Sequence, residues 1–165
     1  YNCPVKFEEK EQSAEKKADP KPYTPSQMVQ SIRIQLKEEL GGGETDLIAQ
    51  KLMDYFEREK PYLNPDIKIL DMADVLCTNK TYLSKAVNGS LGKNFSQIVN
   101  WYRVRDAVNL YASNPDLTID ELRIKSGFRS VSTFNTAFSK YTGKTPADWC
   151  KSYKRHVEDV TKSDM

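Results

Sequence analysis

The stretch that decides the fold is LRIKSGF at residues 122–128, together with SVSTFNTAF at residues 130–138. Its pattern predicts a short helix, a tight corner at Gly127 and a second helix, which is a helix-turn-helix arrangement. An earlier part of the chain repeats the pattern, with MADVLC at residues 72–77 and NKTYLSKAV at residues 79–87. The sequence therefore predicts two similar helix-turn-helix units.

The two units correspond position by position. Cys77 corresponds to Gly127 at a spacing of 50 residues, and Gly92 corresponds to Gly143 at a spacing of 51. One such pattern is a weak signal, but two copies joined by a long helical stretch favour a DNA-reading protein. The reason is that two rigid units can address two neighbouring major-groove segments of one duplex.

Helix starts are marked along the rest of the chain. Asn94 with Gln97 and Thr118 with Glu121 have the spacing of capping boxes. Pro146 stands where a helix tolerates a missing N–H group. No stretch alternates as a strand does, so we expect an all-α fold. The helices are expected at residues 46–59, 69–77, 80–89, 94–113, 118–126, 131–141 and from 146 onward. The first of them is expected to have a buried face made by Leu47, Ile48, Leu52, Tyr55 and Phe56.

Four segments are expected along the chain. Residues 1–25 are rich in Lys and Glu and contain four prolines, which is typical of a flexible linker. Residues 26–43 combine an N-terminal helix, with apolar residues every four positions, and a joint of three glycines. The role of this helix stays open between a linker helix, a dimer contact and a helix resting on the domain. Residues 44–155 are the expected DNA-binding domain, and residues 156–165 an acidic, frayed tail.

Composition excludes several classes of protein. No run of 18 apolar residues and no signal peptide is visible. The three cysteines lack metal-ligand spacing and fit a reducing, cytoplasmic location, and the single His156 is expected to be incidental. The glycines at 41–43 lack the Lys-Ser/Thr of a P-loop. With no nucleophile–base pair either, we expect no enzyme, no cofactor and no metal site.

Positive charge is concentrated where the repeated pattern lies. Residues 79–155 hold 13 basic and 5 acidic side chains, a net charge of +8, whereas the whole chain has a net charge of only +2. Such a block fits a polyanionic partner. A basic solvated surface explains the charge equally well. The residues on the helix faces are therefore needed to distinguish the two interpretations.

The second helix of the second unit has two unlike faces. Phe134, Ala137, Phe138 and Tyr141 form one apolar stripe. The other side carries short hydrogen-bonding groups and no acid, which suits a major groove because phosphates repel acids and base edges pair with amides and hydroxyls. The candidate DNA-binding residues on it are Ser132, Thr133, Asn135, Thr136 and Lys140.

The corresponding helix of the first unit has the same character. Leu83, Ala86 and Val87 are expected to point inward, and the outward side again has no carboxylate. Its candidate DNA-binding residues are Asn79, Lys80, Thr81, Ser84 and Lys85. For Asn79 a helix cap and a base contact both remain open, whereas for Lys85 and Asn135 we favour DNA contact over a solvated side chain.

Phosphate contacts are expected beside helix starts, where backbone N–H groups also attract anions. The candidates are Lys93, Arg129, Ser130 and Lys144. Arg103, on the long helix, is expected to have a structural role in an ion pair with an acid of its own helix or of the next unit.

In these residues the chain resembles the AraC/XylS family of transcription regulators, over about residues 47–153. The most specific matches are Gly127-Phe128, Ser132-Thr133-Phe134, Ala137-Phe138, Lys140, Gly143, Thr145-Pro146 and Trp149. The linker pattern of Asn100-Trp101-Tyr102-Arg103-Val104 followed by Ala107 is similar too. The resemblance implies a seven-helix domain of two helix-turn-helix subdomains joined by a rigid helix, with the outward residues of helices 80–89 and 131–141 entering adjacent major-groove turns.

Two positions depart from the family pattern. Arg123 stands where a small residue is usual, and Thr136 where several members place a long basic residue. Either the second unit reads DNA weakly, or Asn135 and Lys140 make more of the contact. The family also implies an upstream sensor or dimerisation domain.

Two classes of function are compatible with these residues. The first is sequence-specific binding of double-stranded DNA in transcription regulation. The second is a helical protein-interaction module that docks on RNA polymerase. Salt separates them, because binding that releases counterions from DNA weakens steeply as salt rises.

Overall fold

The computed structural model describes residues 44–163, which form seven α-helices and one 3-10 helix with no strand among them. The elements are α2 (Glu44–Glu59), η1 (Pro61–Leu63), α3 (Ile69–Val75), α4 (Lys80–Leu91), α5 (Phe95–Ser113), α6 (Ile119–Lys125), α7 (Val131–Thr142) and α8 (Pro146–Ser163). The predicted all-α fold is confirmed. The expected linker at 1–25, the helix at 26–40 and the glycine joint lie outside the described residues.

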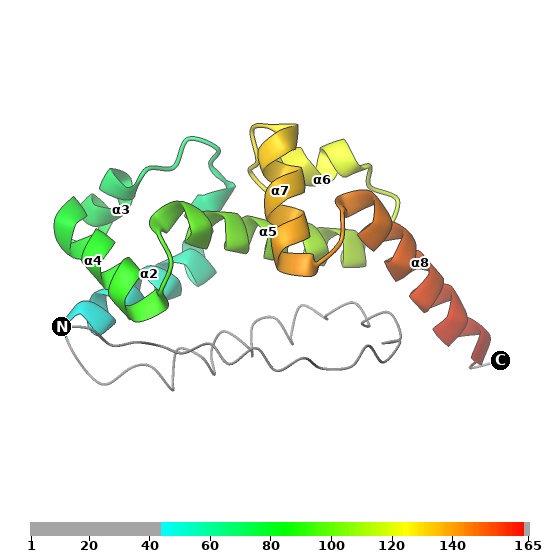
Figure 1. Cartoon of the computed structure of the whole chain (residues 1–165), viewed down its shortest axis with the longest axis horizontal. Coiled ribbons are helices and arrows are strands. Elements are labelled where there is room, and N and C mark those ends of the chain that lie inside the picture. The colour runs from blue at the N-terminus through cyan, green and yellow to red at the C-terminus, as the bar shows by residue number, and fades with distance from the viewer. Residues whose placement is uncertain (1–43, 164–165) are drawn as a thin grey trace, which may run out of the picture.

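The helices form two units joined by α5, which runs through the middle of the molecule (Figure 1). α2, α3 and α4 surround the first apolar core, which includes Leu52, Phe56 and Leu83. α6, α7 and α8 surround the second, which includes Leu122 and Phe134.

α5 contributes to both cores. Ile98, Val99, Trp101 and Tyr102 belong to the first core, and Val104, Ala107, Val108 and Tyr111 to the second. Residues 101–108 are all buried, so this part of the helix is covered on every side, as expected of a helix packed between two bodies rather than one lying on a surface. α5 is thus a shared structural element and not a tether.

The repeat predicted from the sequence is present in the backbone. Cys77 and Gly127 both have positive φ values, of 53° and 87°. After each corner an amide closes the same loop, Thr78 N donating to Ala73 O at 2.9 Å and Phe128 N to Arg123 O at 3.0 Å. The two turns are therefore the same structure built from different residues.

Caps fix the ends of the helices as predicted. Both expected capping boxes form, Asn94 with Gln97 and Thr118 with Glu121. Gly92 and Gly143 end α4 and α7 in the left-handed conformation. Because the two helices start and end at corresponding positions, each presents the same length to solvent.

Two expectations about elements were wrong. Leu47 was expected on the buried face of α2, but its side chain is 54% exposed and the buried positions include Ala49, Leu52 and Phe56. Residues 156–163, expected as a frayed tail, continue α8 as a helix. Trp149 and Tyr153 lie one turn apart and pack against the second core, which anchors the first part of α8. The exposed end of α8 continues the same helix.

Arg103 joins the two units. Its Nε donates to Tyr62 O at 2.7 Å and its Nη2 to Asn64 O at 2.9 Å, while its guanidinium lies 5.6 Å from the centre of the Phe128 ring. The structural role expected for Arg103 is confirmed, but the expected acidic partner was wrong. The planar, forked donor instead satisfies two backbone carbonyls of the first unit that the second unit covers.

The remaining contacts between the units are few but close. Gly127 packs on η1, and a Cβ at this position would lie 2.7 Å from Tyr62 O. Tyr141 of α7 donates from its hydroxyl to Gln97 O of α5 at 3.0 Å. Arg129 forms an ion pair with Asp66 at 2.5 Å. The close approach of Gly127 to η1 and the Tyr141 hydrogen bond to α5 hold α7 in a fixed position relative to both elements.

No helix within residues 44–163 combines the length and apolarity that crossing a bilayer requires.

Candidate nucleic-acid interface

α7 presents a polar face to solvent. Phe134, Ala137 and Phe138 are buried and Tyr141 is half-buried, as the predicted apolar stripe requires. The five predicted DNA-binding residues of this helix, Ser132, Thr133, Asn135, Thr136 and Lys140, are all exposed. Ser130 caps the helix, its Oγ accepting from Thr133 N at 3.1 Å. The polar face is therefore accessible to a duplex.

α4 repeats this arrangement. Leu83, Ala86 and Val87 are buried, and the predicted contact residues Lys80, Thr81 and Lys85 are exposed. Ser84 is half-buried and its hydroxyl accepts from Asn88 Nδ2 at 3.3 Å. Neither α4 nor α7 contains an acidic residue.

Asn79 caps α4. Its Oδ1 accepts from Tyr82 N at 2.9 Å, which confirms the capping interpretation. The cap uses the oxygen of the carboxamide, and the two N–H donors of the same group remain on the side chain. A DNA contact by Asn79 is compatible with this geometry and stays a prediction.

Tyr82 is a candidate that the sequence analysis missed. It lies in the first turn of α4 and its side chain is 56% exposed, whereas Tyr62 and Tyr102 of the first core are buried. The available signal was that Tyr82 falls outside the stripe of Leu83, Ala86 and Val87. An amphipathic ring on a polar helix face can contact both thymine methyl groups and phosphates.

The predicted phosphate contacts lie at helix starts, but two of them have protein partners. Arg129 pairs with Asp66, and Lys144 Nζ donates to Ser152 Oγ at 3.1 Å. Lys93 is half-buried just before the cap of α5, and exposed Ser130 caps α7. Phosphate binding by Arg129 or Lys144 would exchange these partners for a phosphate oxygen.

Arg123, which departs from the family pattern, braces the second corner. Its Nη1 donates to Phe128 O at 3.0 Å and to Arg129 O at 2.7 Å, and its Nε to Asp120 Oδ1 at 2.8 Å. The guanidinium thus holds the carbonyls of the turn that leads into α7. A small residue could not do this.

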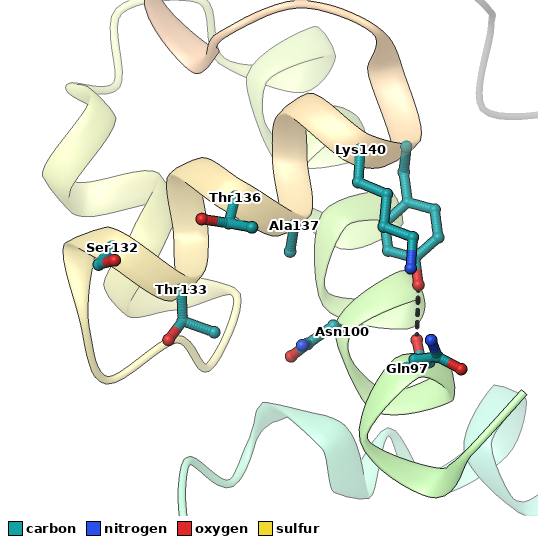
Figure 2. A pocket seen from close by; sticks show the side chains of 8 residues that line it. Gln97, Asn100, Ser132, Thr133, Thr136, Ala137 and Lys140 are labelled. Carbon is teal, nitrogen blue, oxygen red and sulfur yellow. Dashed lines mark hydrogen bonds between the residues drawn. The ribbon is translucent and has the colours of Figure 1, made fainter.

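A cleft of about 300 Å³ lies between α5 and α7. Figure 2 shows Asn100 of α5 pointing toward Thr133 of α7 from the opposite wall. Gln97, Ser132, Thr136, Ala137, Lys140 and Tyr141 complete the lining. Burial raises the pKa of Tyr141, so its hydroxyl remains a neutral donor to Gln97 O. Four of these residues were predicted from the sequence to lie on the polar face of α7, whereas Gln97 and Asn100 were not.

Residues 72–152 match a family described as a helix-turn-helix domain. The matched range begins in α3 and ends in α8, and therefore contains α4 and α7 and the corners before them.

Curated relatives are regulators of transcription by name. An uncharacterized HTH-type transcriptional regulator of Staphylococcus aureus (strain MSSA476) is 26% identical over 115 residues, covering 70% of this chain and 14% of that protein. The uncharacterized transcriptional regulatory protein YesN of Bacillus subtilis (strain 168) is 32% identical over 88 residues, covering 52% and 24%. The chain thus matches only a small part of the length of these relatives.

Among solved structures, a similar one is the C-terminal domain of AraT, a response regulator from Geobacillus stearothermophilus. The TM-score is 0.57 at 24% identity, covering 67% of this chain and 88% of that domain. This similarity supports the fold of two helical units around a shared helix.

Proposed function

We propose that α4 and α7 bind two neighbouring major-groove segments of one DNA duplex. The match to a helix-turn-helix family and the names of the curated relatives, which are transcriptional regulators, support this proposal. The proposed functional unit spans residues 44–155. The observation that carries the proposal is the pair of exposed, acid-free helix faces at corresponding positions.

The geometry explains how two short helices can act together. A single helix in a major groove contacts only a few bases, so one unit alone discriminates weakly. Here α5 contributes to both cores, and Arg103 and Gly127 fix the second unit on the first. The two helices are therefore already held in their relative positions in the folded protein. Binding the second DNA segment then costs little additional conformational entropy.

Different residues have different tasks in this proposal. Lys85 and Asn135 read base edges, since a lysine can donate to guanine acceptors and an asparagine can form a bidentate pair of hydrogen bonds with adenine. Lys93, Arg129, Ser130 and Lys144 contact phosphates and set the position of the domain without reading sequence.

The relatives favour a role as one module of a larger regulator. The AraT match is itself a C-terminal domain, and the matched region is a small fraction of the curated relatives. We therefore propose that DNA binding by residues 44–155 is controlled by a further sensor or dimerisation domain.

The experiment that tests the function is selection of duplexes from a random pool, followed by affinity measurements over a range of salt. We expect one enriched sequence, with an affinity that falls linearly in log–log scale as salt rises, because displaced counterions return to the DNA. The same chain with Lys80, Lys85, Lys93 and Lys144 changed to Gln should give a shallower slope. If no sequence is enriched and binding to any duplex is insensitive to salt, the proposal is wrong and docking on a protein is favoured.

A further inference from the structure

Seven of the eight residues that line the cleft between α5 and α7 have a side-chain group that can donate a hydrogen bond. Its polar lining residues are amides, hydroxyls and one ammonium, and none of the eight lining residues is acidic. Lys140 supplies the single full charge, with its Nζ 5.6 Å from the centre of the Tyr141 ring. A wall of this kind is suited to an anion that accepts several hydrogen bonds at once.

The donors on the two walls are available to a ligand. Within the described residues, the Asn100 carboxamide and the Thr136 hydroxyl make no hydrogen bond to protein. Ser130 Oγ donates to Thr133 Oγ1 at 2.8 Å. The oxygen of Thr133 is thus already accepting from its neighbour, which leaves its own proton to be donated away from the cap.

The cleft adjoins the face of α7 that the proposed function assigns to DNA. Ser132, Thr133, Thr136 and Lys140 line the cleft, whereas Asn135 does not. Spacing on a helix accounts for this division, since Thr133, Thr136 and Lys140 recur at three- and four-residue steps and share one side. The polar face therefore has an outer edge with Asn135 and an inner edge that turns toward α5.

We propose that this cleft holds one phosphodiester group of the DNA backbone, with Asn100, Thr133 and Lys140 donating to its oxygens. The inference rests on the proposed function, because it takes α7 to lie in a major groove. A strand leaving that groove passes the flank of the helix, and the flank that faces the other unit is the one occupied by the cleft. Asn100 is then a positioning residue contributed by the linker helix, and Thr133 and Lys140 hold the backbone rather than read bases.

The test uses the duplex that the protein itself enriches, with each linkage near the α7 segment replaced in turn by a neutral methylphosphonate. For the unaltered chain we expect one linkage whose replacement lowers affinity about tenfold, since hydrogen bonds to a charged group are lost. For Asn100→Ala the same replacement should have almost no further effect. Asn109→Ala, on the same helix but outside the cleft lining, should behave like the unaltered chain.

A gain of affinity provides a second readout. Asn100→Lys should bind enriched and random duplexes more tightly by a similar factor, and should steepen the salt slope by about 0.9 because one more phosphate is neutralised. Thermal unfolding of each variant shows that it is folded before binding is compared.

The outcomes separate this inference from the function on which it rests. If the chain binds its enriched duplex with the expected salt dependence but no linkage is coupled to Asn100, the cleft proposal alone is overturned. If no duplex is enriched, both are overturned. If inorganic phosphate alone binds the cleft at millimolar concentration, Asn100→Ala abolishes that binding and no linkage is coupled, the cleft is a free-anion site and not a DNA contact.

Discussion

Gly127 is the residue at which the local turn and the contact between units meet. Its φ of 87° lies in the left-handed region, and the nearest atoms to a Cβ would be the backbone oxygens of Tyr62 and Leu63 at 2.7 and 2.8 Å. Arg103 holds the Tyr62 carbonyl, and backbone carbonyls cannot rotate away as a flexible side chain can. A side chain at Gly127 would therefore strain the corner and push the two units apart.

Gly127→Ala should lower the free energy of unfolding by clearly more than Gly143→Ala. Both residues have positive φ, which costs a residue with a Cβ about 1–2 kcal/mol. Gly143 has nothing within 4 Å of a Cβ, so its substitution measures the backbone cost alone. Urea unfolding of the two variants gives the comparison, and equal losses would mean that the close approach to η1 does not matter.

The sequence predicted the corner at Gly127 but not what packs against it. The local pattern specifies a tight turn, whereas proximity to Tyr62, some 65 positions earlier, depends on how the two units pack. For the same reason Arg103 was assigned a structural role but the wrong partner. Its real partners are backbone carbonyls, which leave no signature in the identity of the residues.

At the scale of single elements, α4 and α7 are fixed by the same features at both ends. Each begins at a side-chain cap, Asn79 or Ser130, and ends at a glycine in the left-handed conformation. α4 buries four residues and α7 buries three, and neither helix contains an acidic residue. Periodicity and caps made these helices predictable from sequence. The cleft beside α7 was not predicted, because the sequence shows Asn100 only as one polar residue of a buried helix. The cleft is formed by the packing of α7 against α5, which no local pattern reveals.

Lys85→Ala and Asn135→Ala should each reduce the preference for the enriched duplex over random DNA by about 1–3 kcal/mol, because each removes a base-reading group. Lys144→Ala should weaken binding to both duplexes by a similar factor, since a phosphate contact carries no sequence information. Competition binding at fixed salt gives these ratios. If both reader variants kept the ratio of the unaltered chain, the assignment of the helix faces would be wrong.

At the scale of the whole molecule, two small cores act as one body. Neither core is large, but α5 is buried in both, and Arg103, Gly127 and Tyr141 bridge the units. The orientation of α7 relative to α4 is consequently set by backbone-directed contacts rather than by exposed ion pairs. Such contacts do not weaken with salt as the Arg129–Asp66 pair does, because burial shields them from counterions.

Arg103→Lys should destabilise the fold by about 1–3 kcal/mol, because an ammonium cannot reproduce the forked contact with Tyr62 O and Asn64 O. It should also weaken binding to a duplex with both segments more than binding to a duplex with one. Arg58→Lys, on the exposed side of α2, serves as the control and should leave both properties unchanged. Equal weakening on the two duplexes would show that Arg103 does not set the spacing of the units.

The most direct test of two reading helices held at a fixed separation is to insert base pairs between the two segments of the enriched duplex. A rigid frame predicts that five inserted pairs, which turn the second segment to the opposite side, and ten, which restore the side but add about 34 Å, both reduce affinity to that of a single segment. Full affinity after the ten-pair insertion, or affinity that ignores the spacing altogether, would contradict the account.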